Sequence, residues 1–433
     1  MLLQDRFGQM LTTTSAPAAE HYVAALDHLF SMHSAARPAI DQALEADPEF
    51  ALAHCVDSRV RLFEGDTPGA IAAAEHAVEL AGRASARERQ HARIVAMVAR
   101  GENAAALPLV RQHAADYPRD ALPLSFALGV YSLLGFGGFV DHHEQQLALL
   151  ESLAPSWDED WWFLSWLGWS YVETGQWRKG IRMLDRSLEL KQDNANAAHG
   201  RAHGYYEMGA AAEGLGFLEA WLPGYGPEEP LHCHIAWHMA LTHLQRGDFE
   251  SALEVYDRFI RPSVSAALPM FTMVDCAAFA WRSQLSGFAL DTEHLQEIKR
   301  FAVAHFPGPA LPFVNLHGML ARQLSDSVLA DEFARAITGP SDESALARVN
   351  APLCLAISAY GRGEYRAAAD SLESVLPQAA ALGGSHAQRD VIVDTLISAL
   401  IRAGDGEAAV AALRQRNQAR AAHLDQAWYS RLA

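Results

Sequence analysis

The apolar residues of this chain recur at helical spacing, and glycines interrupt the pattern at intervals. The clearest stretch begins at Trp161 and reads "WWFLSWLGWSYVETGQWRKGIRMLDRSLEL", with a helix-length segment on either side of Gly175. Small residues let two helices approach closely, and a glycine can end a helix in a left-handed turn. The pattern therefore predicts a hairpin of two packed helices.

Further copies follow when the turn glycine is used as the register mark. A repeat of about 34 residues with small and aromatic residues at fixed offsets is typical of the tetratricopeptide repeat. Over 161–260 we expect three consecutive hairpins whose first helices start near Trp161, Ala195 and Cys233. The other turn glycines, each expected to close a helix of similar length, are Gly65, Gly101, Gly135, Gly209, Gly247, Gly363 and Gly404.

The chain shows no strand-rich segment and no linker of the kind that separates domains. We therefore expect an all-α fold, a single tetratricopeptide-repeat-like superhelical solenoid of helical hairpins over residues 1–433. Within it we expect N-terminal helices over 1–48, regular repeats over 49–260, irregular helical repeats over 261–345 and C-terminal repeats over 346–433. The third segment is called irregular because "RPSVSAALP" and "HFPGPALPF" interrupt its helices.

The composition limits the cellular location and the classes of partner that we expect. Half of the 433 residues are hydrophobic and the formal charge is -18, so we expect a folded protein that binds neither nucleic acid nor membrane surfaces. Asp5 and Arg6 interrupt the opening where a signal peptide would be apolar, and no segment has the length of a membrane span, so we expect a cytoplasmic protein. The four cysteines lie far apart, which favours neither a disulfide framework nor a thiolate zinc site.

Histidines gather on two neighbouring first helices. His199 and His203 are one helical turn apart, with Glu207 one turn further, and His234 and His238 repeat this spacing in the next hairpin. Both pairs are expected on the face that lines the groove of the solenoid. Because adjacent first helices pack side by side, we expect the four imidazoles to converge.

Two chemistries fit such a cluster. Imidazoles one turn apart on a helix are suited to zinc or a similar divalent metal, and Glu207 could complete the ligand shell. A metal-free histidine site for general acid and base work fits equally well, with the same four histidines as catalytic candidates. The cluster lacks the HExxH motif, and either pair alone could be a hydrogen-bonded structural feature.

Other polar and aromatic residues are candidates for ligand binding. Glu88 and His91 share one groove-facing helix, and Trp162 and Trp169 could form an aromatic wall, although inter-helix packing is the more common role of tryptophan. In "GGSHAQRD" the glycines end a helix and the serine can cap the next. Its first turn then holds Gln388, Arg389 and Asp390. Because Arg389 opposes the helix dipole, we expect it to contact a carboxylate or another anionic group.

The same residues carry a family resemblance. The chain resembles the tetratricopeptide repeat protein 38 family in "LGGSHAQRD", in "CHIAWHMAL" followed by "RGDFESALEVYD", and in "HGRAHGYYEM". The segments "LTTTS", "ADPEFALAH" and "RERQH" resemble it in the same order, so the likeness spans nearly the whole chain. His386 departs from the asparagine of the family pattern. The resemblance implies the fold rather than a reaction, and it adds Trp237 and His317 to the candidate ligand-binding residues.

Two functions remain open on these observations. The first is a histidine-lined pocket that binds a small molecule, with an enzymatic role in which the histidines are metal ligands or general acids and bases. The alternative is a scaffold that binds a peptide or helix in its groove. An open groove favours the scaffold, whereas converging histidines in a closed pocket favour the first function.

Overall fold

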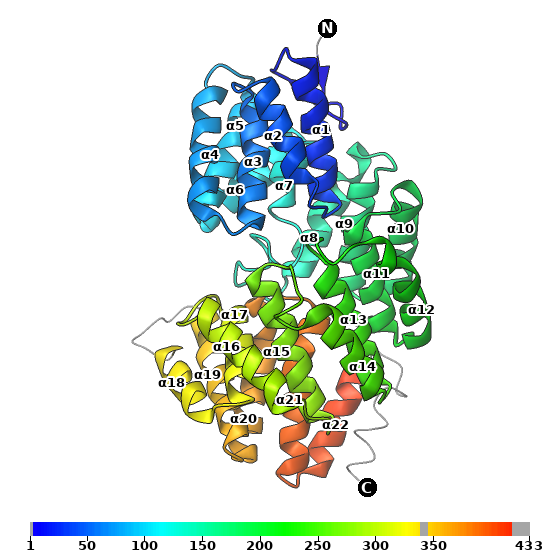
Figure 1. The fold of residues 1–433 in the computed structure, drawn as a ribbon, viewed down its shortest axis with the longest axis vertical. Helices are drawn as coiled ribbons and strands as arrows, with labels where there is room; N and C mark the ends of the chain where they lie inside the picture. The colour runs from blue at the N-terminus through cyan, green and yellow to red at the C-terminus, as the bar shows by residue number, and fades with distance from the viewer. Residues whose placement is uncertain (1–2, 338–344, 418–433) are drawn as a thin grey trace. The chain divides into compact units, whose positions relative to one another are not determined.

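The computed structural model describes residues 3–337 and 345–417, and these form helices joined by short turns (Figure 1). The all-α fold class is confirmed. The strands β1 (Leu3–Gln4) and β2 (Met10–Leu11) form a two-residue antiparallel pair, with Leu3 opposite Leu11. In chain order the α-helices are α1 (Ala16–Phe30), α2 (Ala36–Ala46), α3 (Ala51–Phe63), α4 (Thr67–Ala81), α5 (Ala86–Ala99), α6 (Asn103–Asp116), α7 (Ala121–Ser125), α8 (His142–Leu153), α9 (Trp161–Glu173), α10 (Trp177–Leu190), α11 (Ala195–Met208), α12 (Ala211–Trp221), α13 (His232–Gln245), α14 (Phe249–Val255), α15 (Pro269–Leu285), α16 (Thr292–His305), α17 (Pro312–Gln323), α18 (Ser327–Ile337), α19 (Ala345–Gly361), α20 (Tyr365–Val375), α21 (His386–Arg402) and α22 (Gly406–Asn417).

Local contacts divide the chain into two compact units. Unit 1 comprises Met1–Gly137, His143–Ser170 and Met183–Ala197, and unit 2 comprises Gly138–His142, Tyr171–Arg182 and Ala198–Ala433. In each unit consecutive helices pack as hairpins, for example α3 with α4 in unit 1 and α19 with α20 in unit 2. The predicted single solenoid over 1–433 stays a prediction, and residues 418–433 of its last segment lie outside the described residues.

The turn glycines confirm most of the predicted register. All but one of the glycines used as marks have the positive φ of a left-handed turn, as does Gly175. The three hairpins predicted over 161–260 begin at Trp161, Ala195 and His232. Many helices begin at a side-chain cap, in which Ser15, Asp66 or Ser85 accepts a hydrogen bond from a first-turn N–H group.

Gly135 is the exception, because the helix that it was predicted to close ends at Ser125 and residues 126–141 form turns. The buried amide of Gln146 takes over both backbone groups of Gly129: it accepts from Gly129 N at 2.7 Å and donates to Gly129 O at 3.1 Å. Gly129 has a φ of 84°, and a Cβ atom there would lie 2.9 Å from the ring of Trp166. The close approach of this ring therefore requires glycine in a turn.

In unit 2, helix α21 lies on the face that the first helices of the hairpins present. Trp281 Nε1 on α15 donates to Thr395 Oγ1 at 2.9 Å, and Arg282 Nη2 donates to Ala387 O at 2.5 Å. Tyr206 on α11 donates through its hydroxyl to Asp390 Oδ2 at 2.7 Å. These contacts fix α21 against α11 and α15.

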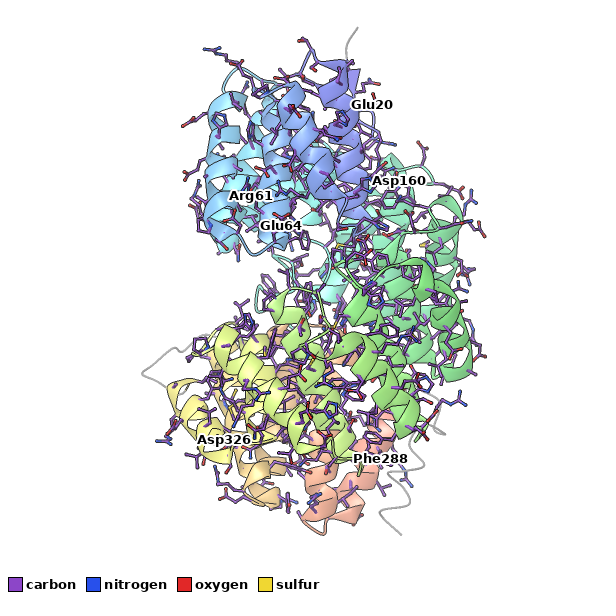
Figure 2. The ribbon with its side chains drawn as sticks, in the orientation of Figure 1. Glu20, Arg61, Glu64, Asp160, Phe288 and Asp326 are labelled. Atoms are coloured by element: carbon purple, nitrogen blue, oxygen red, sulfur yellow. The ribbon has the colours of Figure 1, made fainter. Side chains whose placement is uncertain are left out.

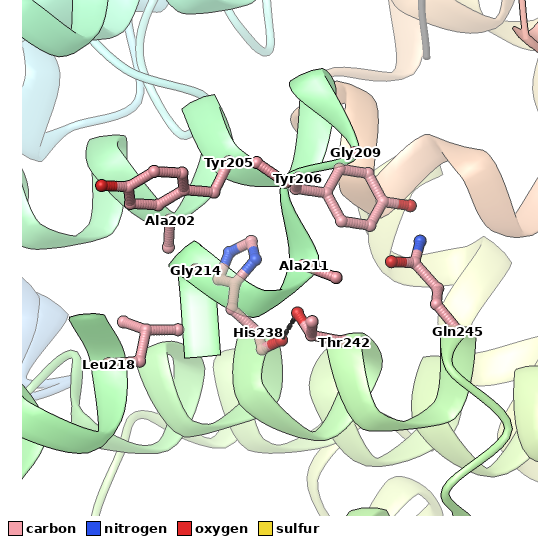
Figure 3. A pocket seen from close by; sticks show the side chains of 11 residues that line it. Ala202, Tyr205, Tyr206, Gly209, Ala211, Gly214, Leu218, His238, Thr242 and Gln245 are labelled. Carbon is pink, nitrogen blue, oxygen red and sulfur yellow. Dashed lines mark hydrogen bonds between the residues drawn. The ribbon is translucent and has the colours of Figure 1, made fainter. Parts of the chain in front are cut away.

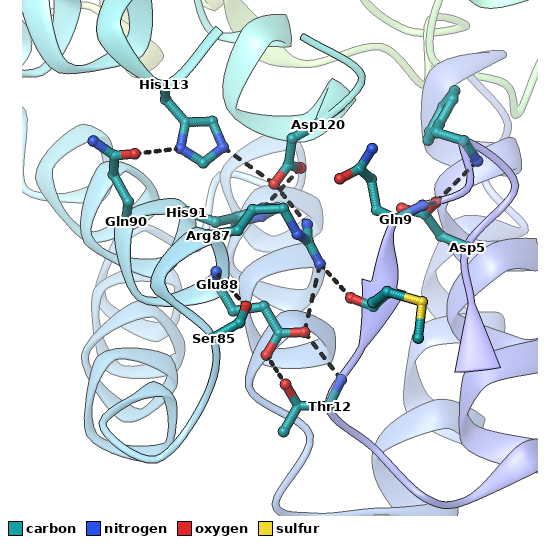
Figure 4. Close-up of polar contacts among 12 residues, drawn as sticks. Asp5, Gln9, Thr12, Ser85, Arg87, Glu88, Gln90, His91, His113 and Asp120 are labelled. Carbon is teal, nitrogen blue, oxygen red and sulfur yellow. Dashed lines mark hydrogen bonds and ion pairs between the residues drawn. The ribbon is translucent and has the colours of Figure 1, made fainter. Parts of the chain in front are cut away.

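In unit 1, the N-terminal segment is held against α5 by a buried polar cluster (Figure 4). Arg87 donates to Asp120 Oδ2 at 2.6 Å and to Met10 O at 2.7 Å. Asp120 also bonds to His91 Nδ1 at 3.0 Å and to His113 Nε2 at 3.1 Å. Asp120 is 4% exposed, so these partners replace water around its charge.

Asp5 makes the folding of the N-terminal segment sensitive to pH. Its Oδ1 accepts from Phe7 N and Gln9 N, and burial, assisted by nearby Asp120, raises its pKa from 3.8 to about 6. Between these values the unfolded state releases its proton first, so the stability that Asp5 contributes falls as the pH rises from about 4 to about 6. At neutral pH the free energy of unfolding is therefore lower by roughly 2–3 kcal/mol than it would be if Asp5 kept its ordinary pKa.

We therefore expect Asp5→Asn, which keeps the acceptor oxygen without the charge, to be more stable than wild type at pH 7 and similar at pH 4. Urea unfolding of both proteins at several pH values measures the difference in free energy of unfolding. A difference that does not change between pH 4 and pH 7 would contradict this account of Asp5.

Charged side chains lie mainly on the outside, as the exposed Glu20 and Glu64 illustrate (Figure 2). None of the helices in the described residues combines the length and the apolar character that a membrane crossing requires.

Candidate metal centre

Four histidines converge between α11 and α13 of unit 2, as the sequence predicts. Each of His199, His203, His234 and His238 contributes a ring nitrogen to a group whose atoms all lie within 4.8 Å of one another. His199 Nε2 and His203 Nε2 are 2.9 Å apart, and the rings of His203 and His238 have centroids 4.4 Å apart. His199 is half-buried, and the other three are buried. The cluster is therefore compact and largely shielded from water.

Two buried carboxylates form hydrogen bonds with two of these histidines. Glu173, at the end of α9, lies 3.0 Å from His203 Nδ1 through Oε1. Asp275 on α15 lies 2.9 Å from His234 Nδ1 through Oδ1. Burial raises the pKa of Asp275, and the adjacent His234 ring opposes that rise. Both carboxylates are at most 1% exposed, so each is held in place by protein groups.

These carboxylates determine which ring nitrogens face the centre. A carboxylate accepts hydrogen bonds, so Nδ1 of His203 and Nδ1 of His234 carry the protons. With the Nδ1 proton donated to a carboxylate, the Nε2 atom is the ring position that can act as a ligand. Histidines bound to metals commonly donate their second N–H to a carboxylate, which fixes the ring orientation and raises the basicity of the ligating nitrogen.

His238 lacks any such partner. Among the described residues, neither of its ring nitrogens has a hydrogen-bond partner, although the side chain is 2% exposed. Burial, together with the neighbouring imidazoles, holds the pKa of His238 and that of His199 well below the usual value for histidine. Burial also lowers the pKa of His203. These three rings are therefore neutral at pH 7, which is the form that binds a metal ion.

The spacing and charge fit a divalent transition metal. Four nitrogens around a tetrahedral zinc at about 2.0–2.1 Å are about 3.4 Å apart, so small side-chain adjustments would bring the present group into this arrangement. The carboxylates of Glu173 and Asp275 together carry a charge of about -2 when ionised, which a divalent cation balances. The donor set of imidazoles suits zinc, copper, nickel or iron rather than magnesium or calcium.

A small cavity lies beside His238, whose ring stands among Ala202, Tyr206 and Ala211 (Figure 3). Its volume is about 10 Å³, which is room for about one water molecule. The site therefore has room for an ion and a water, and the predicted small-molecule pocket stays a prediction. A wider groove of about 490 Å³ lies between α10, α11 and α12, and none of the site residues predicted from the sequence lines it.

Three further predicted residues lie inside unit 2. Glu207 is buried, but it does not belong to the group of four histidines found among the described residues. The glutamate that contacts the cluster is Glu173, through His203. Trp237 is fully buried and stacks on the ring of His234, with centroids 5.3 Å apart. His317 is fully buried, bonds to Phe313 O through Nδ1 at 2.8 Å, and has its pKa lowered to about 4 by burial.

The first turn of α21 has the predicted cap and an unpredicted pairing. Ser385 Oγ accepts from Gln388 N, and Gln388 Oε1 accepts from Ser385 N at 3.0 Å, so Gln388 completes a capping box. Arg389 Nη1 donates to the carbonyl oxygens of Gly383 and Gly384. These carbonyl dipoles help to offset the unfavourable position of the cation near a helix N-terminus. The predicted anionic partner of Arg389 stays a prediction.

The remaining predicted residues lie in unit 1. Glu88 accepts from Thr12 N at 3.0 Å and also from its hydroxyl, while His91 bonds to Asp120. Trp162 is fully buried against Phe30, and Trp169 is 4% exposed. Each of these residues has a role in packing or in holding the N-terminal segment, and ligand binding by them stays a prediction.

Sequence reasoning did not select the two carboxylates as site residues. Glu173 was visible as a polar residue on a groove-facing helix, four positions after Trp169. Asp275 had a clearer signal, because it is the sole acidic residue in the otherwise apolar helix α15. A lone carboxylate in a buried helix requires a partner.

A scan against protein-family models finds no match. Solved helical repeat structures of the tetratricopeptide type align with most of the chain at low similarity. They include the human IFIT1 dimer with m7Gppp-AAAA (12% identity, 96% of this chain and 76% of that chain, TM-score 0.35), yeast Tom70 (13%, 96% and 94%, 0.33) and the APC/C hetero-tetramer Cut9-Hcn1 (12%, 94% and 87%, 0.37). Such distant likeness says nothing of what this chain binds, and the expected absence of a nucleic-acid partner stays a prediction.

The fold class rests on the helices and turns themselves. Helical hairpins, many of them closed by a glycine in a left-handed turn, recur in both units. Membership of the tetratricopeptide repeat protein 38 family stays a prediction. The described residues have an all-α, tetratricopeptide-repeat-like fold of helical hairpins.

Proposed function

We propose that this protein binds one divalent transition-metal ion, with zinc as the first candidate, through His199, His203, His234 and His238. The observation that carries the proposal is the convergence of four ring nitrogens within 4.8 Å, two of them backed by buried carboxylates. The repeat fold then serves as a rigid frame that brings ligands from two hairpins together. A catalytic role of the bound ion, in which it activates a water or a small ligand, extends this proposal.

A metal-free histidine site accounts less well for the same contacts. A general acid or base needs one ring with a pKa near the working pH and space for a substrate. Here burial moves the pKa values of three rings downward, and the adjacent cavity has room for about one water. A cation that replaces the hydrogen bond between His199 and His203 would be bound by ring nitrogens in a water-poor space.

The test is a zinc titration of the full chain, purified without a histidine tag and stripped with a chelator. Competition with a chromophoric chelator gives the stoichiometry and the dissociation constant. We expect one zinc ion per chain, loss of binding in His203→Ala, and retention in His243→Ala, whose histidine lies on α13 outside the cluster. Equal affinity in the wild type and His203→Ala would refute the proposed site.

Asp275 provides a separate prediction, because it contacts a ligand rather than the ion. Asp275→Asn should bind zinc about 10–100 times more weakly. Loss of the carboxylate partner lowers the basicity of the ligating nitrogen and no longer fixes the orientation of the His234 ring. The same competition titration measures the change. Asp331→Asn is a matched control, because Asp331 pairs with Arg362 away from the cluster. Unchanged affinity in Asp275→Asn would mean that His234 is not a ligand.

A further inference from the structure

One carboxylate of the four-histidine site also holds helix α21. Glu173 bonds to His203 Nδ1 through Oε1, and its Oε2 accepts from the backbone N–H of His386 at 3.0 Å. His386 is the first residue of α21. Glu173 is 1% exposed, so its charge is balanced by groups of the protein. A single buried carboxylate thus joins a candidate metal ligand to the start of the C-terminal hairpin.

A second contact ties the same two helices together. Tyr206 follows His203 by three residues on α11, and its hydroxyl donates to Asp390 Oδ2 at 2.7 Å. The tyrosine ring also lines the small cavity beside His238. The first turn of α21 is therefore fixed next to the histidine cluster at two points, while its later turns rest on α15 through Thr395.

We propose that metal binding and the docking of α21 are coupled, so that the ion holds α21 in place and its removal lets α21 open more readily. The inference rests on the proposed metal function. A cation on His203 Nε2 makes the Nδ1–H group a stronger donor to Glu173. This stronger bond fixes the position of the Glu173 carboxylate, so that its Oε2 atom stays in place to accept from the N–H group at the start of α21, where the helix dipole favours negative charge.

Coupling of this kind acts equally in both directions. Coupled sites typically change each other's affinity by about 5–150-fold, and the factor is the same whichever site is perturbed. A change that undocks α21 completely should therefore weaken zinc binding by the factor by which zinc slows the opening of α21. A change that only loosens α21 should leave the affinity nearly unchanged, while zinc still slows the opening by that factor.

Hydrogen exchange of the full chain with and without zinc measures the effect of zinc on the opening of α21. We expect zinc to slow exchange of the α21 amides by about 5–150-fold, and to leave the amides of α3 in unit 1 unchanged. Glu173→Gln should reduce the slowing in zinc-saturated protein, because an amide NH₂ group cannot accept from His386 N while the amide oxygen serves His203.

Thr395→Val tests the coupling at a distance from the site, in a chain whose α21 is held less firmly. The substitution keeps the shape of the side chain and removes the acceptor of the Trp281 hydrogen bond. We expect faster α21 exchange in the metal-free variant, and zinc should slow this exchange by the same factor as in the wild type. Ser374→Ala, on the exposed side of α20, is the control that should change neither the α21 exchange nor the effect of zinc on it.

The outcomes separate the two proposals. Stoichiometric zinc binding with unchanged α21 exchange, or α21 exchange in Thr395→Val that zinc does not slow, would overturn the coupling and leave the metal site standing. Failure of zinc to bind the wild type at one ion per chain would overturn both.

Discussion

Replacing His238 by leucine is expected to stabilise the metal-free protein and to abolish its response to zinc. Both ring nitrogens of His238 are buried without partners among the described residues, and a buried unsatisfied polar group costs about 1–3 kcal/mol. Leucine has a similar size and removes this cost. Zinc at about 100 times its dissociation constant should stabilise the wild type by about 2.7 kcal/mol, and the variant loses this gain.

Thermal and urea unfolding of both proteins, with and without zinc, measure these two changes. His243→Leu is the matched control, because His243 lies on the same helix and bonds to Asp248 outside the cluster, so it should keep the zinc response. A structural role for His238 predicts the opposite pattern, in which the leucine variant is less stable without zinc. That pattern, or a retained zinc response, would count against the site.

Replacing Arg87 by leucine is expected to destabilise unit 1 by about 3–5 kcal/mol, because it leaves a buried carboxylate without its cation. Burial alone would raise the pKa of Asp120, but His91, His113 and Arg87 together hold it well below the usual value. The stability gained from this depressed pKa is present above the ordinary pKa of aspartate and is lost as the pH falls through the folded value. The loss in Arg87→Leu should therefore be largest near neutral pH.

Chemical unfolding at pH 7 measures this loss. The double variant Arg87→Leu, Asp120→Asn should recover part of the stability, because the unpaired charge is gone. Arg186→Leu serves as a control, since Arg186 pairs with Glu159 at the surface and its removal should change stability little. Equal losses in the single and double variants would show that the charge of Asp120 is not the cause.

The convergence of the four histidines could be predicted because it depends only on the spacing within each helix and on the packing of neighbouring hairpins. His199 with His203 and His234 with His238 are each one turn apart, and neighbouring first helices of a repeat must lie side by side. The same reasoning selected Glu207 for the shell, since it continues the stripe of His199 and His203. It could not weigh Glu207 against Glu173, because the choice depends on how side chains of two hairpins pack.

The long-range contacts could not be predicted from the sequence for a related reason. Tyr206 and Asp390 are separated by 184 residues, and Asp275 follows His234 by 41. Repeat periodicity fixes the contacts between neighbouring hairpins, but it does not indicate that α21 lies across earlier first helices. Gly135 failed as a register mark because the side chain of Gln146, rather than a helix, satisfies the backbone of Gly129.

X-ray absorption at the zinc edge, on the full chain loaded with one equivalent of zinc, tests the central claim most directly. The account predicts a first shell of four nitrogens at about 2.0–2.1 Å, with the outer scattering of imidazole rings. It also predicts that His238→Leu loses one imidazole from this shell or binds no zinc. A shell dominated by oxygen, or a spectrum that His238→Leu leaves unchanged, would contradict the assignment of these histidines as a metal site.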